Sequence, residues 1–397
     1  MLQNATDPHS LSNAASQPAS SSIQDLLDRG ELVKHREFWF TDGSLVLRAD
    51  NTLFRVHISQ LCRKTAFFRD LFALPQPPAA AAADGSHTTE ERFDGCPVLV
   101  LYDSPEDVAN LVKVIYDGPN FGINDRDDFN VLSGVLRLSS KYLVQEPTRA
   151  KALAHISTAW PSTLKAWDLR EDLARLYEVQ TGQSRGHRYA NPIAVVNLAR
   201  EIDADELLPS AFYELSRYTF TEIFEPAPGD PLEPPPSPFT SALGTPPTSA
   251  PVLPSAFAAS PSSTAGRQHA ITALIQNMEH AGPDPPRCPP SHRRSRSAQA
   301  LALPGSPTGS PGPRRPVCAT PAACRKDLGE LIELATQHYL FDREQGCADP
   351  LYVAEELGQL KSAEFSDCVA CARALEAWAA RERERLWRAV PDWFRLR

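Results

Sequence analysis

The sequence predicts an α+β protein in which a small sheet is accompanied by helices and followed by further helical segments. Three observations predict it. Apolar residues alternate over residues 44–58, which is the period of a strand, and from residue 59 they recur at helical spacing. An unbroken apolar run, Val98–Tyr102, adds a third strand. Helical periodicity then returns, with interruptions, to the end of the chain.

The first two strands are predicted to form a hairpin. Ser44–Asp50 is followed directly by Asn51–Ile58, and Asp50 and Asn51 are residues that tolerate the positive φ of a tight turn. Val98–Tyr102 shows no alternation, which is typical of a strand covered on both faces. We therefore expect a hairpin with a third, more buried strand beside it.

One helix is predicted from Ser59 to Phe72. Leu61 and Phe68 recur on one face, and the Ser59 side chain is placed to accept a free N–H of the first turn. The stretch 75–93 has no periodicity and is rich in Pro and Ala, so we expect an exposed loop there.

The clearest helix starts at Ser104-Pro105, where a capping residue precedes proline in the first turn, and ends at Gly118. Its apolar residues form one stripe. Eight further helical segments are predicted by the same spacing: Asp127–Tyr142, Thr148–Thr158, Thr163–Val179, Pro192–Ile202, Leu207–Tyr218, Arg325–Ala335, Pro350–Leu360 and Glu364–Val390.

These residues resemble a known family. A strand that ends in Val56-His57, a helix that closes on Phe-Phe-Arg-Asp-Leu-Phe at 67–72, and a helix that ends in Val-Ile-Tyr-Asp-Gly at 114–118 are similar to a BTB/POZ domain. The likeness is strongest to the BTB-domain proteins abundant in mushroom-forming fungi, whose C-terminal halves also end in a Trp-rich, Arg/Glu-rich helix. The resemblance covers about the first 225 residues well. It implies a small sheet wrapped by helices and used for protein–protein contact.

Composition divides the rest of the chain. More than half of the 37 prolines lie between Pro226 and Pro321, in a segment rich in Ser, Ala and Thr that cannot bury enough surface to fold. We therefore predict this order: a disordered leader at 1–22, a BTB/POZ domain at 36–168 with the loop 75–93 inserted, a helical extension at 169–224, a disordered linker at 225–323 and a helical C-terminal segment at 324–397.

Charge and composition narrow the function classes. The formal net charge of -9 and the pI near 5.6 argue against broad nucleic-acid binding. The sequence holds neither an apolar run of about 18 residues, as a membrane span requires, nor a secretory signal at its start. Eight cysteines in so long a chain fit a reducing compartment. We expect an intracellular protein, in the cytoplasm or the nucleus.

The motifs of common enzymes are absent. The sequence has no GxGxxG after a strand, no GxxxxGK[ST] loop and no HExxH helix. His57 has no nucleophile elbow around it, and we interpret it as a structural residue. The sequence therefore predicts a protein without catalytic residues and without a cofactor.

The cysteines near the C-terminus allow two interpretations. Cys368-x-x-Cys371 would put two sulfurs on one helix face, and Cys324 and Cys347 could complete a tetrahedral zinc site, with His338 as a further ligand. The spacing is unlike that of a zinc finger, and a lone CxxC in an apolar stripe is more often a pair of small core residues. The core interpretation is the one the spacing favours.

The resemblance also indicates partners. BTB-like folds pair through apolar surface on their first helices and N-terminal strand, so it implies association with a second copy or a related protein. The aromatic residues expected at such a surface are Phe38, Trp39, Phe67 and Phe68. Two alternatives stay open: a substrate adaptor that binds a cullin-type ubiquitin ligase, and a transcriptional regulator.

Phosphorylation sites are expected in the predicted linker. Proline-directed kinases act on flexible Ser-Pro and Thr-Pro steps, and phosphate adds negative charge. The candidates are Ser237, Thr245, Ser260, Ser306, Ser310 and Thr320.

Overall fold

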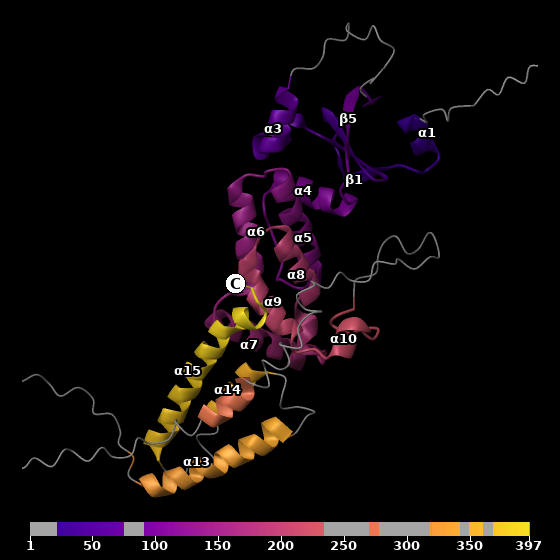
Figure 1. Cartoon of the computed structure of the whole chain (residues 1–397). Helices are drawn as coiled ribbons and strands as arrows, with labels where there is room; N and C mark the ends of the chain where they lie inside the picture. Colours follow the sequence, from indigo (N-terminus) through magenta and orange to yellow (C-terminus); the bar gives the residue numbers. More distant parts are fainter. Residues whose placement is uncertain are drawn as a thin grey trace, which may run out of the picture. The chain divides into compact units, whose positions relative to one another are not determined.

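The computed structural model of the chain has an α+β fold with one five-stranded sheet and many helices (Figure 1). The α+β class predicted from the sequence is confirmed. Two compact units are present: unit 1 comprises Met1–Gly122 with Asn130–Leu153, and unit 2 comprises Ile123–Phe129 with Ala154–Arg397. The structure describes residues 22–74, 91–233, 270–277, 318, 320–341, 349–359 and 368–396.

The sheet lies in unit 1, with the strand order β1-β3-β2-β5-β4. The hairpin is confirmed: β2 and β3 are antiparallel, and Asp50 in the turn has a φ of 48°. β1 runs parallel to β3, β5 parallel to β2, and β4 antiparallel to β5. The strands are β1 Val33–Trp39, β2 Leu45–Ala49, β3 Thr52–Val56, β4 Arg92–Phe93 and β5 Cys96–Leu101.

Two of these strands were not expected. Most side chains of β1 are exposed, and its pairing with β3 is irregular between Lys34 and Trp39, so its sequence carries no alternating signal. β4 lies at the end of the stretch 75–93 that was predicted to be an exposed loop. Phe93 is buried there, which corrects the prediction for these last residues, while 75–90 lie outside the described part of the chain.

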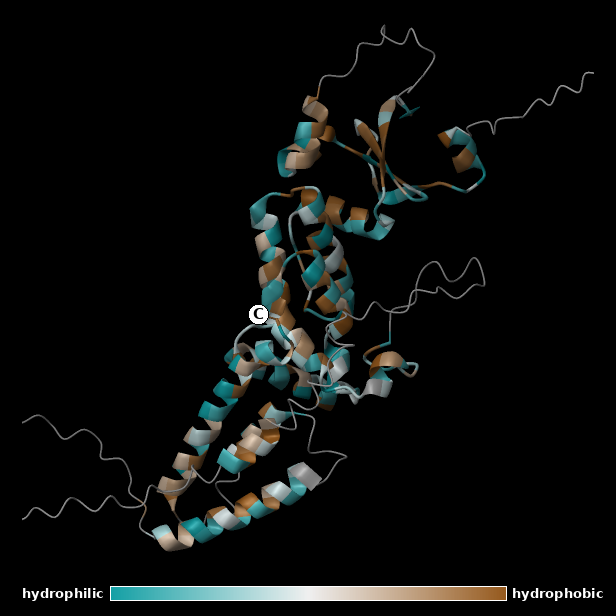
Figure 2. Ribbon diagram, viewed as in Figure 1, coloured by the Kyte–Doolittle hydropathy of each residue, from teal (hydrophilic) through white to brown (hydrophobic). Residues whose placement is uncertain are grey.

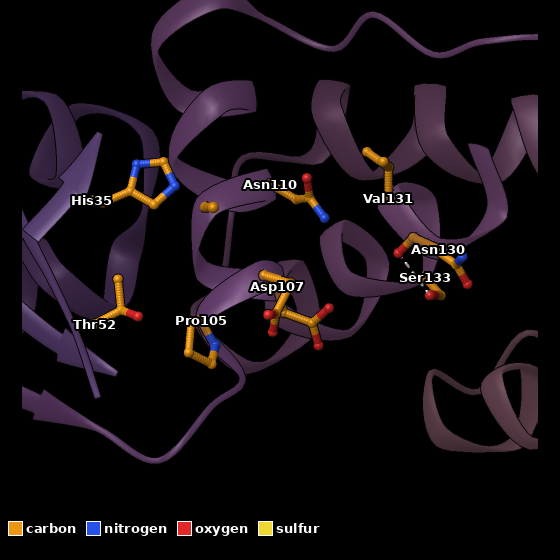
Figure 3. A pocket seen from close by; sticks show the side chains of 10 residues that line it. His35, Thr52, Pro105, Asp107, Asn110, Asn130, Val131 and Ser133 are labelled. Carbon is orange, nitrogen blue, oxygen red and sulfur yellow. Dashed lines mark hydrogen bonds between the residues drawn. The ribbon is translucent and has the colours of Figure 1, made fainter. Parts of the chain in front are cut away.

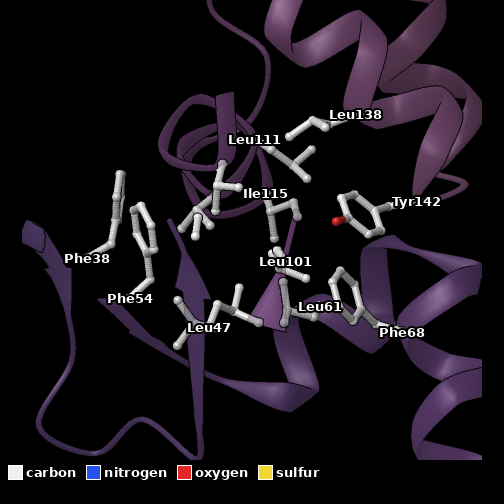
Figure 4. Close-up of a cluster of buried hydrophobic side chains, with 14 of the residues drawn as sticks. Phe38, Leu47, Phe54, Leu61, Phe68, Leu101, Leu111, Ile115, Leu138 and Tyr142 are labelled. Carbon is white, nitrogen blue, oxygen red and sulfur yellow. The ribbon is translucent and has the colours of Figure 1, made fainter. Parts of the chain in front are cut away.

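The two faces of the sheet belong to two apolar clusters. Alternate residues of β2 and β3 point to opposite faces, so Leu47 and Phe54 enter one cluster while Val46 and Leu53 enter the other. Figure 4 shows the larger cluster, where Phe38 and Phe54 lie side by side and the Tyr142 ring covers Phe68. The sheet is therefore packed on both faces.

The coverage of β5 is less complete than the sequence predicts. Val100 is 42% exposed, and Tyr102, beyond the end of the strand, is 93% exposed. The expectation of a strand covered on both faces is therefore wrong for its second half.

The single helix expected from Ser59 to Phe72 is two helices, α2 Ile58–Lys64 and α3 Ala66–Ala73. Thr65 separates them because it has an extended backbone and forms an isolated β-bridge with Val144. The Thr65 hydroxyl accepts the N–H of Phe68 at 3.4 Å and so caps α3. Ser59 caps nothing, since the N-cap of α2 is His57, which makes no side-chain capping bond.

The helix α4 follows its predicted signals. Ser104 caps α4 by accepting the Asp107 N–H at 3.1 Å, Pro105 occupies the first turn, and Gly118 ends the helix with a φ of 84°. α4 spans Pro105–Asp117, and the remaining helices of the first 160 residues are α1 Ile23–Asp28, α5 Arg126–Lys141 and α6 Glu146–Ala159.

Unit 2 is helical in its described residues, and every segment predicted there contains a helix. Figure 2 shows hydrophobic and hydrophilic residues alternating around α13 and α15, as in amphipathic helices. None of the described helices is long and apolar enough to cross a membrane. The elements are α7 Leu164–Thr181, η1 Arg185–Arg188, α8 Pro192–Glu201, η2 Asp205–Leu207, α9 Leu208–Leu215, α10 Phe220–Phe224, a helix at 270–277, α13 Pro321–Thr336, η5 Gln337–Phe341, α14 Pro350–Gln359 and α15 Val369–Trp393.

The unit boundary after Leu153 precedes the predicted domain boundary at 168. Trp160 and Trp167 are in unit 2, where both are buried and lie against the Arg170 guanidinium. Three stretches of the predicted linker are also ordered, and one of them, 320–323, begins α13. Leu232 is buried in an apolar cluster of unit 2, and the helix at 270–277 buries Ile271.

Candidate functional site

The four aromatic residues predicted at an interaction surface have different positions. Phe38 and Phe68 are 4% and 1% exposed, so both are core residues of unit 1 and do not present a surface. Trp39 is half-buried, with its ring edge against Phe93 and the Lys34 ammonium over its face. Phe67 alone is exposed, at 38%.

Phe67 belongs to an apolar surface, which we call the α3 face, formed by Phe67, Leu71, Leu74 and Leu143. Phe67 and Leu71 are four residues apart and so lie on one side of α3, and Leu74 is the residue that ends the helix. Leu74 and Leu143 are 62% and 58% exposed, and Leu71 is half-buried. The α3 face thus gathers several of the exposed large apolar side chains of unit 1.

Backbone contacts fix Leu143 beside α3. The Ala66 N–H donates to the Leu143 carbonyl at 3.0 Å, and Val144 pairs with Thr65. Leu143 has a φ of 51°, a conformation that is uncommon for residues other than glycine. Surrounding contacts therefore hold a strained residue with its apolar side chain outward, a feature found more often at functional positions than elsewhere.

An open cleft of about 570 Å³ lies elsewhere in unit 1 (Figure 3). His35 and Thr52 reach it from the sheet, Asn110 from α4, and Ser133 from α5. Nδ1 of His35 accepts the Phe38 N–H at 3.1 Å, and the Ser133 hydroxyl donates to the Asn130 carbonyl. Both side chains are thus hydrogen-bonded to backbone groups, and neither forms a base–nucleophile pair in these bonds.

His57 joins three parts of unit 1. Its Nδ1 lies 2.8 Å from the Tyr116 hydroxyl on α4, and its Nε2 lies 3.2 Å from the Asp42 carboxylate. This order of carboxylate, imidazole and hydroxyl resembles a catalytic relay, but burial raises the pKa of Tyr116 above its usual value. An activated nucleophile requires a lowered pKa, so the geometry supports the structural role predicted for His57.

Unit 2 contains a buried charge network that sequence reasoning missed. Arg217 donates to Glu171 at 2.8 Å, to Glu214 at 3.0 Å and to Asp349 at 2.8 Å. Arg170 donates to Glu171 and Glu214 as well. The only sequence signal is Glu214 within the apolar helix α9, because charged residues are rarely buried unless they are paired.

The network joins the C-terminal helices to α7 and α9. Asp349 precedes α14 and also accepts the hydroxyl of Tyr213. On α15, Arg383 pairs with Asp168, and the Trp387 indole N–H donates to the Ser162 carbonyl at 2.9 Å. Contacts between residues more than a hundred positions apart therefore hold unit 2 together.

Four cysteines meet in unit 2 at Cys318, Cys324, Cys368 and Cys371, and their sulfurs all lie within 4.8 Å of one another. Three of them belong to the predicted set. Cys347 lies outside the described residues, and the structure brings in Cys318, which was not predicted. His338 is described, on η5, but is not a member of the group.

The thiols differ in ionisation. The Cys371 N–H donates to the Cys368 sulfur and lowers the pKa of the Cys368 thiol to about 7, whereas burial raises the pKa of Cys371 above its usual value. One sulfur of the group is thus favoured as a thiolate near neutral pH.

Of the six predicted phosphorylation sites, Thr320 is the one within the described residues. It is exposed and occupies the N-cap position of α13. The other five, Ser237, Thr245, Ser260, Ser306 and Ser310, lie outside the described part of the chain.

In comparisons with known proteins, no family model, curated protein or solved structure matches the chain.

Proposed function

We propose that the chain is a non-enzymatic protein-interaction protein that associates with a second copy of itself through the α3 face of unit 1. The observation that carries this proposal is the exposure of three large apolar residues: Phe67 on α3, Leu74 at its end, and Leu143, whose carbonyl binds the Ala66 N–H. Exposed clusters of large apolar residues mark interaction sites in soluble proteins. The resemblance of residues 51–118 to a BTB/POZ domain supports the same use of these helices.

The charges of α3 are compatible with a second copy as the partner. Arg69 and Asp70 are both exposed, on the same helix, with 3.6 Å between the guanidinium and the carboxylate. A two-fold interface places the same patch on both subunits, so each patch must complement itself. α3 carries one basic and one acidic side chain, so its net charge is zero and two copies of the helix do not repel each other.

The non-enzymatic part of the proposal rests on how the polar groups of unit 1 are used. His35 and Ser133 in the cleft bond to the backbone, and His57 contacts a tyrosine whose pKa is raised. Proteins that act by binding need no group poised for proton transfer. The chain then acts by burying the apolar side chains of the α3 face against its partner.

Sedimentation velocity of the full chain at micromolar concentration tests the proposal. We expect a particle of twice the chain mass of 43.6 kDa, and we expect Leu143→Asp to shift it to the monomer. Aspartate tolerates the positive φ of this residue, so the fold is kept while a charge enters the apolar surface. Phe67→Asp provides a second variant on α3.

Val179→Asp is the matched control, because it puts the same charge on an 83% exposed apolar residue of unit 2. It should leave the dimer intact. A wild-type chain that stays monomeric, or a Leu143→Asp variant that dimerises as tightly as wild type, would show the proposal to be wrong.

A further inference from the structure

The cysteine group of unit 2 has the dimensions of a metal site. The Cys318 sulfur lies 3.6 Å from that of Cys324 and 3.7 Å from that of Cys368. Four thiolates bound tetrahedrally to zinc, with Zn–S bonds near 2.3 Å, lie roughly 3.8 Å from one another. Two of the sulfur–sulfur distances therefore match a tetrahedral zinc site, and the whole group, with every pair within 4.8 Å, is compact enough to surround one ion.

Disulfide bonding and simple core packing each fit this geometry less well. In a disulfide the sulfurs are about 2.05 Å apart, so these cysteines are not bonded to one another. Core packing explains Cys324 and Cys371, which start the apolar stripes of α13 and α15. It does not explain Cys318 and Cys368, which are only half-buried and precede the helices.

The local structure also favours a negatively charged ligand set. Cys324 is in the first turn of α13, and Cys368 is the N-cap of α15, with Cys371 three residues later. Both helices thus direct their N-terminal ends, which carry partial positive charge, toward the sulfurs. A zinc ion with four thiolates keeps a net negative charge, which two helix N-termini stabilise.

We propose that Cys318, Cys324, Cys368 and Cys371 bind one zinc ion that joins the start of α13 to the start of α15. Four protein ligands fill the coordination sphere and leave no open position, as in structural rather than catalytic zinc sites. Tetrahedral sulfur sites suit zinc or iron among the common metals, and we commit to zinc. The site is independent of the α3 face, which lies in unit 1.

The consequence for the fold is a cross-link between segments that are 50 residues apart in sequence. The buried stripe of α13 contains Leu328, Leu331 and Ala335, and the cysteines close its N-terminal end. Because ligands brought together by folding couple metal binding to stability, loss of zinc should release α13 first.

Metal analysis of the full-length chain, purified without a histidine tag or a chelator at neutral pH, tests the proposal directly. We expect one zinc per chain, released when a mercurial reagent titrates the thiols. Zinc well below one per chain, or stoichiometric iron in its place, overturns the proposal.

Cobalt substitution tests the ligand set. The cobalt-loaded chain should show the visible bands of a tetrahedral thiolate site, and Cys318→Ser should weaken and shift them. Cys318 lies outside the helices, so this variant keeps the helical sequence intact. Cys62→Ser, which removes a half-buried thiol of unit 1, is the matched control and should leave zinc content and cobalt bands unchanged.

Hydrogen exchange gives a third readout that does not depend on a variant. After a strong chelator removes the metal from the full chain, we expect amide protection to fall several-fold in α13 and in the first turn of α15. α8 should be unchanged. Equal protection in α13 before and after metal removal would contradict a stapling role for the site.

Discussion

In unit 1, the sheet buries Leu47 and Phe54 against helices that follow soon afterwards in the sequence, and the contacts are mainly apolar. In unit 2, Arg217, which lies just after α9, meets Asp349, which is 132 residues further along the chain, and the contact is between charges whose side chains are 21% and 16% exposed. Apolar burial is non-directional and tolerates small shifts, whereas a buried charge without its partner is strongly unfavourable. The two units should therefore fail in different ways.

The largest effect is expected from Arg217→Met, which removes the cation that Asp349 contacts and leaves Glu171 and Glu214 with Arg170 as the arginine of the network. Breaking a buried ion pair costs about 3–5 kcal/mol of folding free energy. Five of the six tryptophans lie in unit 2, so tryptophan fluorescence during urea unfolding measures this loss.

Arg388→Met is the control for that variant, since it removes an exposed arginine that pairs with Glu384 on the surface of α15. Such pairs contribute about 0–1 kcal/mol. If both variants change the unfolding free energy of unit 2 equally, the buried network does not have the role assigned to it.

In unit 1 the matching experiment is Leu47→Ala. Leu47 is 2% exposed in the larger apolar cluster, and its truncation leaves a cavity that costs about 2–4 kcal/mol. Val100→Ala on the neighbouring strand β5 should cost well under half as much, because Val100 is 42% exposed. Urea unfolding followed by far-UV circular dichroism compares the two variants, and equal losses would contradict the apolar packing assigned to this core.

Acid should affect unit 2 more than unit 1. Burial opposes ionisation of Asp349, but the Arg217 charge and the Tyr213 hydroxyl outweigh it, so the pKa of Asp349 lies below its usual value. A lowered folded-state pKa contributes stability that is present above about pH 4 and is lost as the pH falls further. In unit 1, burial raises the pKa of Asp107, so acid favours its folded form.

A fluorescence titration from pH 6 to pH 2 measures this difference. We expect wild type to lose unit 2 structure below about pH 4, and Asp349→Asn to depend less on pH in that range. Asp172→Asn, at a position that is 67% exposed, should titrate as wild type does. An identical pH dependence for Asp349→Asn would mean that this carboxylate does not cause the acid sensitivity.

The smallest effect on stability is expected from removing the cap of α3. It distinguishes the predicted capping residue, Ser59, from the observed one, Thr65. Thr65→Ala removes the α3 cap and the hydroxyl bond to the Leu61 carbonyl, and should cost about 1–2 kcal/mol. Ser59→Ala removes an exposed hydroxyl that caps nothing, so little change is expected. Thermal unfolding of both variants is sufficient, and a larger loss for Ser59→Ala would contradict the two-helix structure.

The elements that could be predicted are those whose causes lie within the element. α4 carries its cap, its first-turn proline and its apolar stripe in its own residues, and it was placed correctly. The break at Thr65 was missed because its cause, the bridge to Val144, lies about eighty residues away. β1 was missed because its exposed side chains leave no alternation to detect.

The candidate sites follow the same rule. Cys368 and Cys371 were recognised as a pair because they share one helix turn, whereas Cys318 follows a proline-rich stretch that gives no sign of what it contacts. Aromatic type alone could not separate Phe67 from Phe68, because the neighbouring positions point to different sides of α3. Tertiary contacts decide which of them is exposed.

The most direct test of the difference between the units is hydrogen exchange on the full chain and on a chain that ends before residue 318. If the C-terminal helices hold unit 2 together, α7 and α9 should lose most of their amide protection in the shorter chain, while β2 and β3 of unit 1 keep theirs. Full protection of α7 and α9 without residues 318–397 would contradict the stabilising role of the C-terminal helices.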